Sequence, residues 1–128
     1  MDPLPVVLGV GGGIAAYKAA ELARALIERG CAVETVMTAA AQEFVQPLTF
    51  AALTGRKVIT SMFGARSADE VLASSVEHIA VAQRNRLLVV APATAHLLAQ
   101  FAHGLAGDFL STLYLAFQGA VVVCPAMN

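Results

Sequence analysis

The fold of this chain is readable in residues 4–38, LPVVLGVGGGIAAYKAAELARALIERGCAVETVMT. The apolar run from Leu4 to Val10 ends in glycines, which predicts a buried strand followed by a tight turn. From Ala15 to Arg29, apolar residues recur on one face of a helix that stops at Gly30, and Ala32 to Met37 is apolar again. Strands that are apolar on both faces and alternate with helices predict a parallel sheet between two layers of helices.

The remaining residues continue this alternation. Thr38 is placed to cap a helix through Phe44, and Ser61 to Ser75, rich in serine and glycine, is expected to be a surface loop. The other expected elements are a helix from Pro47 to Leu53, a weak strand from Lys57 to Thr60, a strand from Arg86 to Ala91, helices from Thr94 to His103 and from Asp108 to Phe117, and a strand from Ala120 to Cys124. The predicted fold class is therefore α/β, a Rossmann-like three-layer sandwich with a parallel sheet, in one domain covering residues 1–128.

The composition limits the partners of the chain. Hydrophobic residues make up 58% and charged residues 13% of the 128 residues, which is more apolar than a monomer of this size usually is. We expect part of this apolar surface to be buried against other copies of the chain. A net charge of −1 without a cluster of Lys and Arg argues against nucleic acid. No basic stretch precedes the first apolar run, so no signal peptide is expected and the predicted location is the cytoplasm.

A membrane span and a disulfide are alternatives that the sequence disfavours. Leu87 to Gly107 carries no formal charge and is long enough to cross a bilayer, but its pattern, with Pro92 and Gln100, is that of a strand, a turn and a helix. Cys31 and Cys124 lie beside or inside expected strands, where cysteine usually acts as a small buried hydrophobe. Neither a disulfide nor a metal site is expected.

Ligands of open parallel sheets bind at the carboxyl ends of the strands, which here are Gly9 to Gly13, Thr38 to Gln42, Ala91 to His96 and Pro125 to Asn128. The first of these loops lets the backbone approach an anion closely. It is not a dinucleotide fingerprint, because Ile14 stands at the third glycine position and the second strand ends without an acid for a ribose diol. The glycines alone leave two interpretations open, mononucleotide or phosphate binding and a simple tight turn.

Several segments carry a more specific signal when they are taken together and in order. They are Gly9-Val10-Gly11-Gly12-Gly13-Ile14-Ala15-Ala16-Tyr17-Lys18, Met37-Thr38, Glu77-His78-Ile79, Ala91-Pro92-Ala93-Thr94-Ala95, Asp108-Phe109-Leu110-Ser111-Thr112 and Pro125-Ala126-Met127-Asn128. In these segments, over nearly its whole length, the chain resembles the homo-oligomeric flavin-containing cysteine decarboxylases, and most closely their bacterial phosphopantothenoylcysteine decarboxylase branch.

The resemblance implies an FMN cofactor and the residues that hold it. By position, the FMN contacts are Gly12, Gly13, Ile14, Thr38, Ala40, Ala41, Gln42, Thr94, Ala95 and His96, with Ala126 near the flavin. The chain departs from the family at Ala40 and Ala41, where relatives often carry a hydroxyl that helps to bind the phosphate, so backbone amides and Thr38 would have to suffice. It also departs at His96, where relatives usually carry Asn or Asp.

The resemblance further implies a reaction, in which FMN oxidises the terminal cysteine of 4'-phosphopantothenoylcysteine and the resulting thioaldehyde loses carbon dioxide. His78 would act as the base or orienting group and Asn128 would anchor the substrate carboxylate. Judged without its motif, a lone histidine is more often structural or exposed than catalytic. The flavin would return the electrons later, and the product would be 4'-phosphopantetheine, on the pathway to coenzyme A.

The resemblance also implies assembly into a homotrimer or higher oligomer, with a synthetase domain often fused to the flavoprotein domain. The family's clamp continues after Pro-Ala-Met-Asn and is followed by a mobile flap with a cysteine, so residues 1–128 are expected to be a domain cut short at its C-terminal end. Two alternatives of the same fold remain, a flavin prenyltransferase-like enzyme and a non-catalytic FMN-binding or regulatory subunit.

Overall fold

The computed structural model describes residues 2–60 and 68–127. Its centre is a sheet of four strands in the order β2-β1-β3-β4, and every pairing between neighbours is parallel. The strands are β1 (Leu4–Val10), β2 (Cys31–Met37), β3 (Leu87–Ala93) and β4 (Ala120–Pro125). The predicted α/β fold is confirmed.

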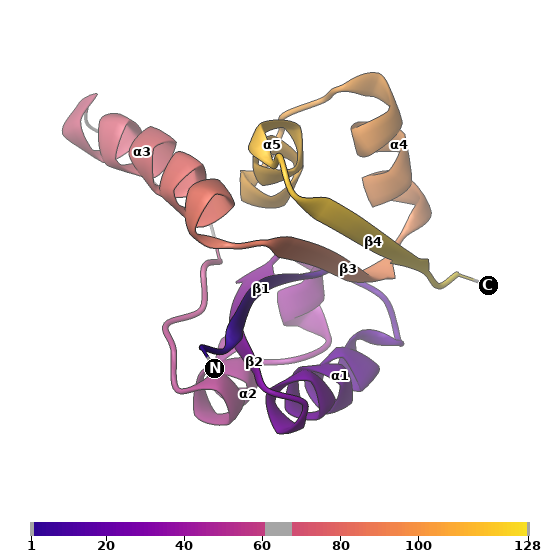
Figure 1. Cartoon of the computed structure of the whole chain (residues 1–128). Helices are drawn as coiled ribbons and strands as arrows, with labels where there is room; N and C mark the ends of the chain where they lie inside the picture. Colours follow the sequence, from indigo (N-terminus) through magenta and orange to yellow (C-terminus); the bar gives the residue numbers. More distant parts are fainter. Residues whose placement is uncertain (1, 61–67, 128) are drawn as a thin grey trace.

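Helices cover both faces of this sheet. On one side lie α1 (Ala16–Glu28) and α2 (Pro47–Thr54), and on the other α3 (Ala68–Arg84), α4 (Ala95–His103) and α5 (Phe109–Ala116), as Figure 1 shows. A short 3-10 helix, η1 (Ala40–Glu43), follows β2. The three layers of the expected sandwich are all present.

The alternation of side chains along β1 divides the core into two parts. Val6, Leu8 and Val10 pack on the α1 and α2 side, whereas Val7 packs on the side of α3 and α5, because successive residues of a strand point to opposite faces. Gly9 also points to the second side, where an added Cβ would stand 2.5 Å from Leu110 Cδ1 of α5. A glycine is required there for α5 to pack against the sheet.

Three of the expected elements differ from the structure. The expected loop from Ser61 to Ser75 is wrong over residues 68–75, which belong to α3, and residues 61–67 lie outside the described part. The serines suggest a loop, but the apolar residues Leu72, Val76 and Ile79 have helical spacing. The strand expected at Lys57 to Thr60 is reduced to one bridge between Ile59 and Val36.

After Thr38 the chain forms only η1 rather than a longer helix. The cap itself is present, since the backbone N–H of Ala41 donates to Thr38 Oγ1 at 3.1 Å. Cys31 is half-buried, but Cys124 is exposed. The expectation of a buried residue is therefore wrong for Cys124, because β4 is an edge strand in the described residues.

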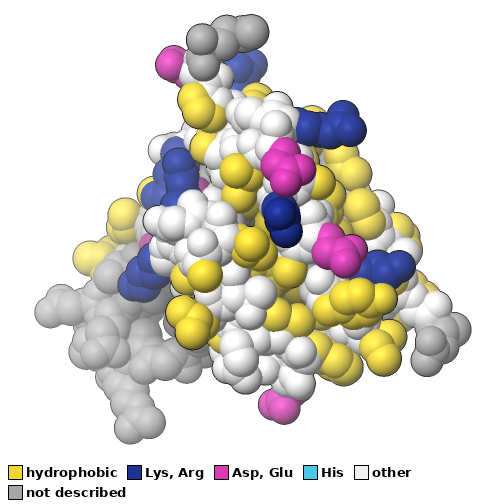
Figure 2. Space-filling view, turned by 90° about the horizontal axis from the view of Figure 1, so that it is seen from below, with side chains coloured by type: hydrophobic (Ala, Val, Ile, Leu, Met, Phe, Trp, Pro, Cys, Tyr) yellow, Lys and Arg dark blue, Asp and Glu magenta, His cyan; other side chains and the backbone are white. Residues whose placement is uncertain are grey.

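The uncharged stretch from Leu87 to Gly107 forms β3, a turn and α4, as its pattern predicts. Within residues 2–60 and 68–127, every helix is too short or too polar to cross a bilayer. Figure 2 views the molecule from below, the side on which α1 and α2 lie in Figure 1. Charged side chains of both signs are interspersed there with apolar ones, so this face is not a surface of one charge.

Candidate functional site

Two of the cavities at the carboxyl ends of the strands adjoin each other. The α4 cavity, about 380 Å³, is lined by Gly12, Thr38, Ala39, Ala40, Thr94, His96, Leu97, Gln100 and Asp108. The α1 cavity, about 400 Å³, is lined by Gly12, Gly13, Ile14, Ala15, Thr94, Ala126 and Met127. Because Gly12 and Thr94 line both, a single ligand can extend from one cavity into the other.

The glycine-rich turn after β1 is held tightly at the boundary between the cavities. Gly11 N–H donates to the carbonyl of Pro92 at the end of β3, at 3.1 Å. A Cβ on Gly12 would overlap Ala40 of η1. Glycine therefore allows the turn to pack directly against η1 and β3, which brings three chain segments to one point.

The starts of η1 and α4 meet at this point. Thr94 is the N-cap of α4, in extended conformation, and its Oγ1 accepts from Leu97 N–H at 3.2 Å. The N–H groups of Ala95 and His96, in the first turn of α4, have no partner within the helix. Such groups, together with the threonine hydroxyls, suit an anion. Among the described residues that line the two cavities, none is Lys or Arg.

Gln100 adds a polar side chain to the α4 cavity that the sequence did not indicate. It lies one helical turn after His96, on the same face of α4, and only 9% of its surface is exposed. Its Oε1 is buried without a hydrogen-bond partner. A polar residue inside an uncharged apolar stretch was the available signal, but periodicity does not tell whether such a residue faces a cavity.

Among the described residues that line these two cavities, Asp108 is the only carboxylate, and it is already hydrogen-bonded. It caps α5, and its Oδ1 accepts from Ser111 N–H at 2.9 Å, while the Ser111 hydroxyl accepts from Asp108 N–H at 3.1 Å. This reciprocal capping box fixes Asp108 to its own helix.

The structure brings together most of the residues that the sequence proposed for the cofactor. Eight of them line the two cavities: Gly12, Gly13, Ile14, Thr38, Ala40, Thr94, His96 and Ala126. Three do not: Ala41 is buried in the core on the α1 side, the Gln42 side chain donates to Thr60 O at 3.5 Å, and Ala95 is exposed. Asn128 lies outside the described residues.

His78 lies apart from both cavities. It lies in the middle of α3, a helix that the sequence analysis did not predict. Its ring packs edge-on against Phe109 of α5, with the ring centroids 6.2 Å apart and the planes at 85°. Its Nδ1 is buried without a hydrogen-bond partner.

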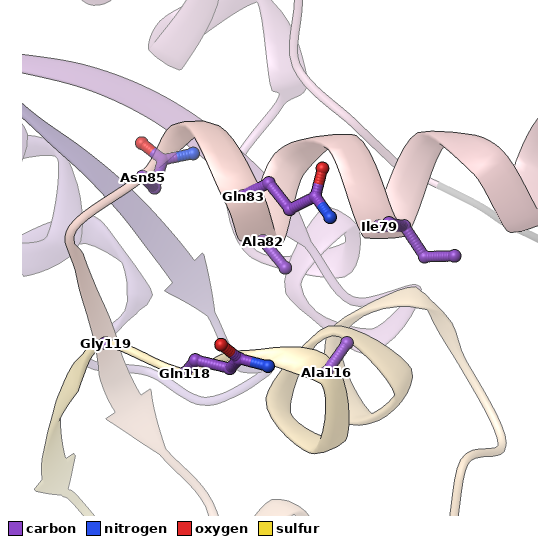
Figure 3. Close-up of a pocket in the computed structure, with 7 residues that line it drawn as sticks. All are labelled: Ile79, Ala82, Gln83, Asn85, Ala116, Gln118 and Gly119. Carbon is purple, nitrogen blue, oxygen red and sulfur yellow. The ribbon is translucent and has the colours of Figure 1, made fainter.

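A third cavity, the amino-end cavity, lies at the other end of the sheet. It measures about 410 Å³ and is lined by Ile79, Ala82, Gln83, Asn85, Ala116, Gln118 and Gly119. Figure 3 shows Gln83 of α3 and Gln118, which follows α5, on opposite sides of it. Asn85 and Gly119 immediately precede β3 and β4, whereas ligands of parallel sheets bind at the carboxyl ends. The adjoining α4 and α1 cavities are therefore the candidate site.

Known proteins similar to this chain include a coenzyme A biosynthesis protein and an FMN-dependent cysteine decarboxylase. The chain is 48% identical, over 123 residues, to the coenzyme A biosynthesis bifunctional protein CoaBC of Vibrio cholerae. The aligned part is 96% of this chain and 30% of that protein, so the chain spans under a third of the length of this curated relative.

Solved structures of decarboxylases have a similar fold. The FMN-dependent cysteine decarboxylase SpaF matches with a TM-score of 0.84 and 31% identity, over 98% of this chain and 69% of that one. A mutant PPC decarboxylase complexed with pantothenoylaminoethenethiol matches with a TM-score of 0.78 and 26% identity, over 100% of this chain and 69% of that one. Since the model of the family described as Flavoprotein matches residues 1–128, this chain belongs to the Flavoprotein family.

Proposed function

We propose that this chain binds FMN and decarboxylates 4'-phosphopantothenoylcysteine to 4'-phosphopantetheine. The observation that carries the proposal is the pair of cavities joined at Gly12 and Thr94, where unpaired backbone N–H groups and hydroxyls converge. The similarity to CoaBC and to a PPC decarboxylase supports the choice of substrate.

The residues present fit a flavin mononucleotide. In the α4 cavity, the Thr38 and Thr94 hydroxyls and the N–H groups at the starts of η1 and α4 would hold the phosphate. In the α1 cavity, Ile14 and Met127, both largely exposed, would cover the apolar ring. Ala40 carries no hydroxyl, but it lines the cavity beside Thr38. Thr38 and backbone N–H groups can therefore bind the phosphate in place of a hydroxyl at position 40.

Bound FMN would take two electrons from the substrate's cysteine, so that the adjacent carboxylate is lost easily as carbon dioxide, and would then return them to give 4'-phosphopantetheine. The protein's part is to bind the substrate over the flavin with its carboxylate held in place. We propose His78 as the base or orienting group and Asn128 as the carboxylate anchor. An unpaired, buried ring nitrogen on His78 is consistent with a histidine whose partner is not in its own chain.

We infer that the chain acts as a homotrimer or higher oligomer. The described part of α3 exposes Leu72, Val76 and Ile79, at 64%, 57% and 47% of their surfaces. Their spacing of four and three residues places them in one apolar stripe. A second copy that covers this stripe would come close to His78 and could place it near another subunit's flavin. A mass equal to one chain in sedimentation at micromolar concentration would contradict this assembly.

Flavin content tests the cofactor directly. The purified chain should be yellow and should release FMN, not FAD or NAD, on heating. Release of a dinucleotide would contradict the proposed use of the two cavities.

Turnover tests the reaction. With 4'-phosphopantothenoylcysteine, the FMN-loaded protein should release carbon dioxide and form 4'-phosphopantetheine, measured by mass spectrometry, and a fused synthetase domain should not be required for this step. Prenylation of FMN from dimethylallyl phosphate would indicate the prenyltransferase-like alternative instead. Stable FMN binding with neither reaction would indicate a regulatory subunit.

A further inference from the structure

We propose that Gln100 binds the phosphate end of the flavin mononucleotide, an inference that rests on the proposed function. Gln100 lines the α4 cavity from the same helix face as His96. It is 9% exposed, and its Oε1 is buried without a hydrogen-bond partner. No other side chain that lines the α4 cavity has a buried polar atom without a partner, among the residues that the structure describes.

The unpaired carboxamide is costly unless a ligand satisfies it. A buried polar atom without a partner costs about 1–3 kcal/mol, and folded proteins retain few of them. A half-turn of the carboxamide exchanges its oxygen and nitrogen, which places the N–H donors of Nε2 where Oε1 now stands. Phosphate oxygens accept such hydrogen bonds.

An anion in the α4 cavity would have to be held by neutral donors. The two cavities contain no Lys or Arg among their described lining residues. The carboxylate of Asp108, which would repel a phosphate, is bonded to Ser111 N–H. Gln100 therefore supplies N–H donors in a part of the cavity whose described lining contains no Lys or Arg. These donors add to the N–H groups of the first turn of α4.

Substitutions that change the charge at position 100 test this role, and the measured quantity is flavin affinity. FMN and riboflavin, which lacks only the phosphate, are titrated into the flavin-free chain and followed by quenching of flavin fluorescence. Gln100→Glu keeps the size of the side chain but places a negative charge in the cavity. We expect it to weaken FMN binding by about 10- to 100-fold and riboflavin binding by no more than about threefold.

Two further variants separate binding from folding. Gln100→Lys adds a cation at the same depth and should bind FMN at least as tightly as the parent, with riboflavin unchanged. Gln100→Met replaces the unpaired amide by an apolar side chain of similar length, so the flavin-free protein should melt at the same or a higher temperature while FMN binding weakens. A structural glutamine would give the opposite result, a lower melting temperature with both flavins weakened together.

Gln118→Glu is the matched control. Gln118 is an exposed glutamine in the amino-end cavity, so its substitution should change neither the FMN affinity nor the riboflavin affinity. The inference is overturned if Gln100→Glu binds FMN like the parent, or if it weakens FMN and riboflavin equally. If the parent chain binds neither flavin, the proposed function fails instead, so the two failures are distinguishable.

Discussion

The two ends of the sheet carry cavities of similar size, about 410 Å³ at the amino end and about 380 Å³ in the α4 cavity, yet their polar groups differ. Near the amino ends, buried Glu34 of β2 accepts hydrogen bonds from Arg84 Nε at 2.8 Å, Arg84 Nη2 at 2.7 Å and Asn85 Nδ2 at 2.7 Å. Asn85 also donates to Val81 O at 2.9 Å. At the carboxyl ends, the Gln100 oxygen is unpaired, and the N–H groups of Ala95 and His96 have no partner within α4. The volume of a cavity therefore does not identify a site, whereas unpaired polar groups do.

The Glu34 cluster, formed by Glu34, Arg84 and Asn85, also has a definite electrostatic state. Burial by itself raises the pKa of the Glu34 carboxyl, but the hydrogen bonds from Arg84 and Asn85 outweigh it, and the pKa lies below its ordinary value of 4.5. The carboxylate in turn raises the pKa of Arg84. This end of the sheet is thus satisfied internally and contributes to stability rather than to binding.

The largest expected effect concerns His78, whose buried and unpaired Nδ1 lies outside the cavities at either end of the sheet. In the FMN-loaded protein, His78→Asn should lower the decarboxylation rate by about 10²- to 10⁴-fold, the usual cost of losing a general base. FMN content and oligomer mass should be unchanged, because His78 does not line the α4 or α1 cavity. A rate within about threefold of the parent would make His78 a structural residue.

A smaller but still large effect is expected for the glycine turn at the carboxyl end. In Gly12→Ala, the new Cβ overlaps Ala40 and must displace the turn from η1. We expect FMN affinity to fall by about 100-fold, equivalent to roughly 3 kcal/mol, in a fluorescence titration. In the matched variant Gly13→Ala, the new Cβ would meet only Thr94 Cγ2, at 3.9 Å, so it should cost far less. Equal losses in the two variants would show that the close packing is unimportant.

The Glu34 cluster should affect stability but not binding. Glu34→Gln should lower the free energy of unfolding at pH 7 by about 1–3 kcal/mol, measured with urea, because it removes charge-assisted hydrogen bonds. Since the pKa of Glu34 is lowered on folding, its stabilisation is present above pH 4.5 and is lost as the pH falls through the folded-state value. The parent and the variant should therefore converge in stability in acid.

The control for this prediction is Glu28, whose pair with Arg24, at 3.4 Å, is exposed on both sides. Glu28→Gln should change stability by less than about 1 kcal/mol. A difference between parent and Glu34→Gln that does not depend on pH would contradict the assignment of the ionised carboxylate.

The smallest effect is expected in the amino-end cavity. Gln83→Leu removes an exposed amide that faces this cavity, and FMN affinity should stay within about threefold of the parent, because the proposed site lies at the other end of the sheet. A tenfold loss in the same fluorescence titration would show that the amino-end cavity is coupled to the flavin site.

Most of the fold was predictable because it depends on local patterns. The apolar run of β1, the Gly30 stop of α1 and the Thr94 and Asp108 caps each specify an element from neighbouring residues. The start of α3 was missed because serine and glycine suggest a loop, although the apolar residues there have helical spacing. Of the candidate site, the residues at the strand ends were found, since parallel strands bring these ends together.

The sequence by itself determined the alternation of strands and helices, the glycine turn and the edge of the sheet at which a ligand would bind, because periodicity and turn chemistry are properties of short segments. Only the tertiary structure decided which side chains meet there. It placed Gln100 in the α4 cavity, Ala41 in the core and His78 against Phe109. It also joined Glu34 to Arg84, fifty residues later in the chain. Such pairings depend on how helices pack across the sheet, and no local pattern encodes which distant groups remain unpaired when the packing is complete.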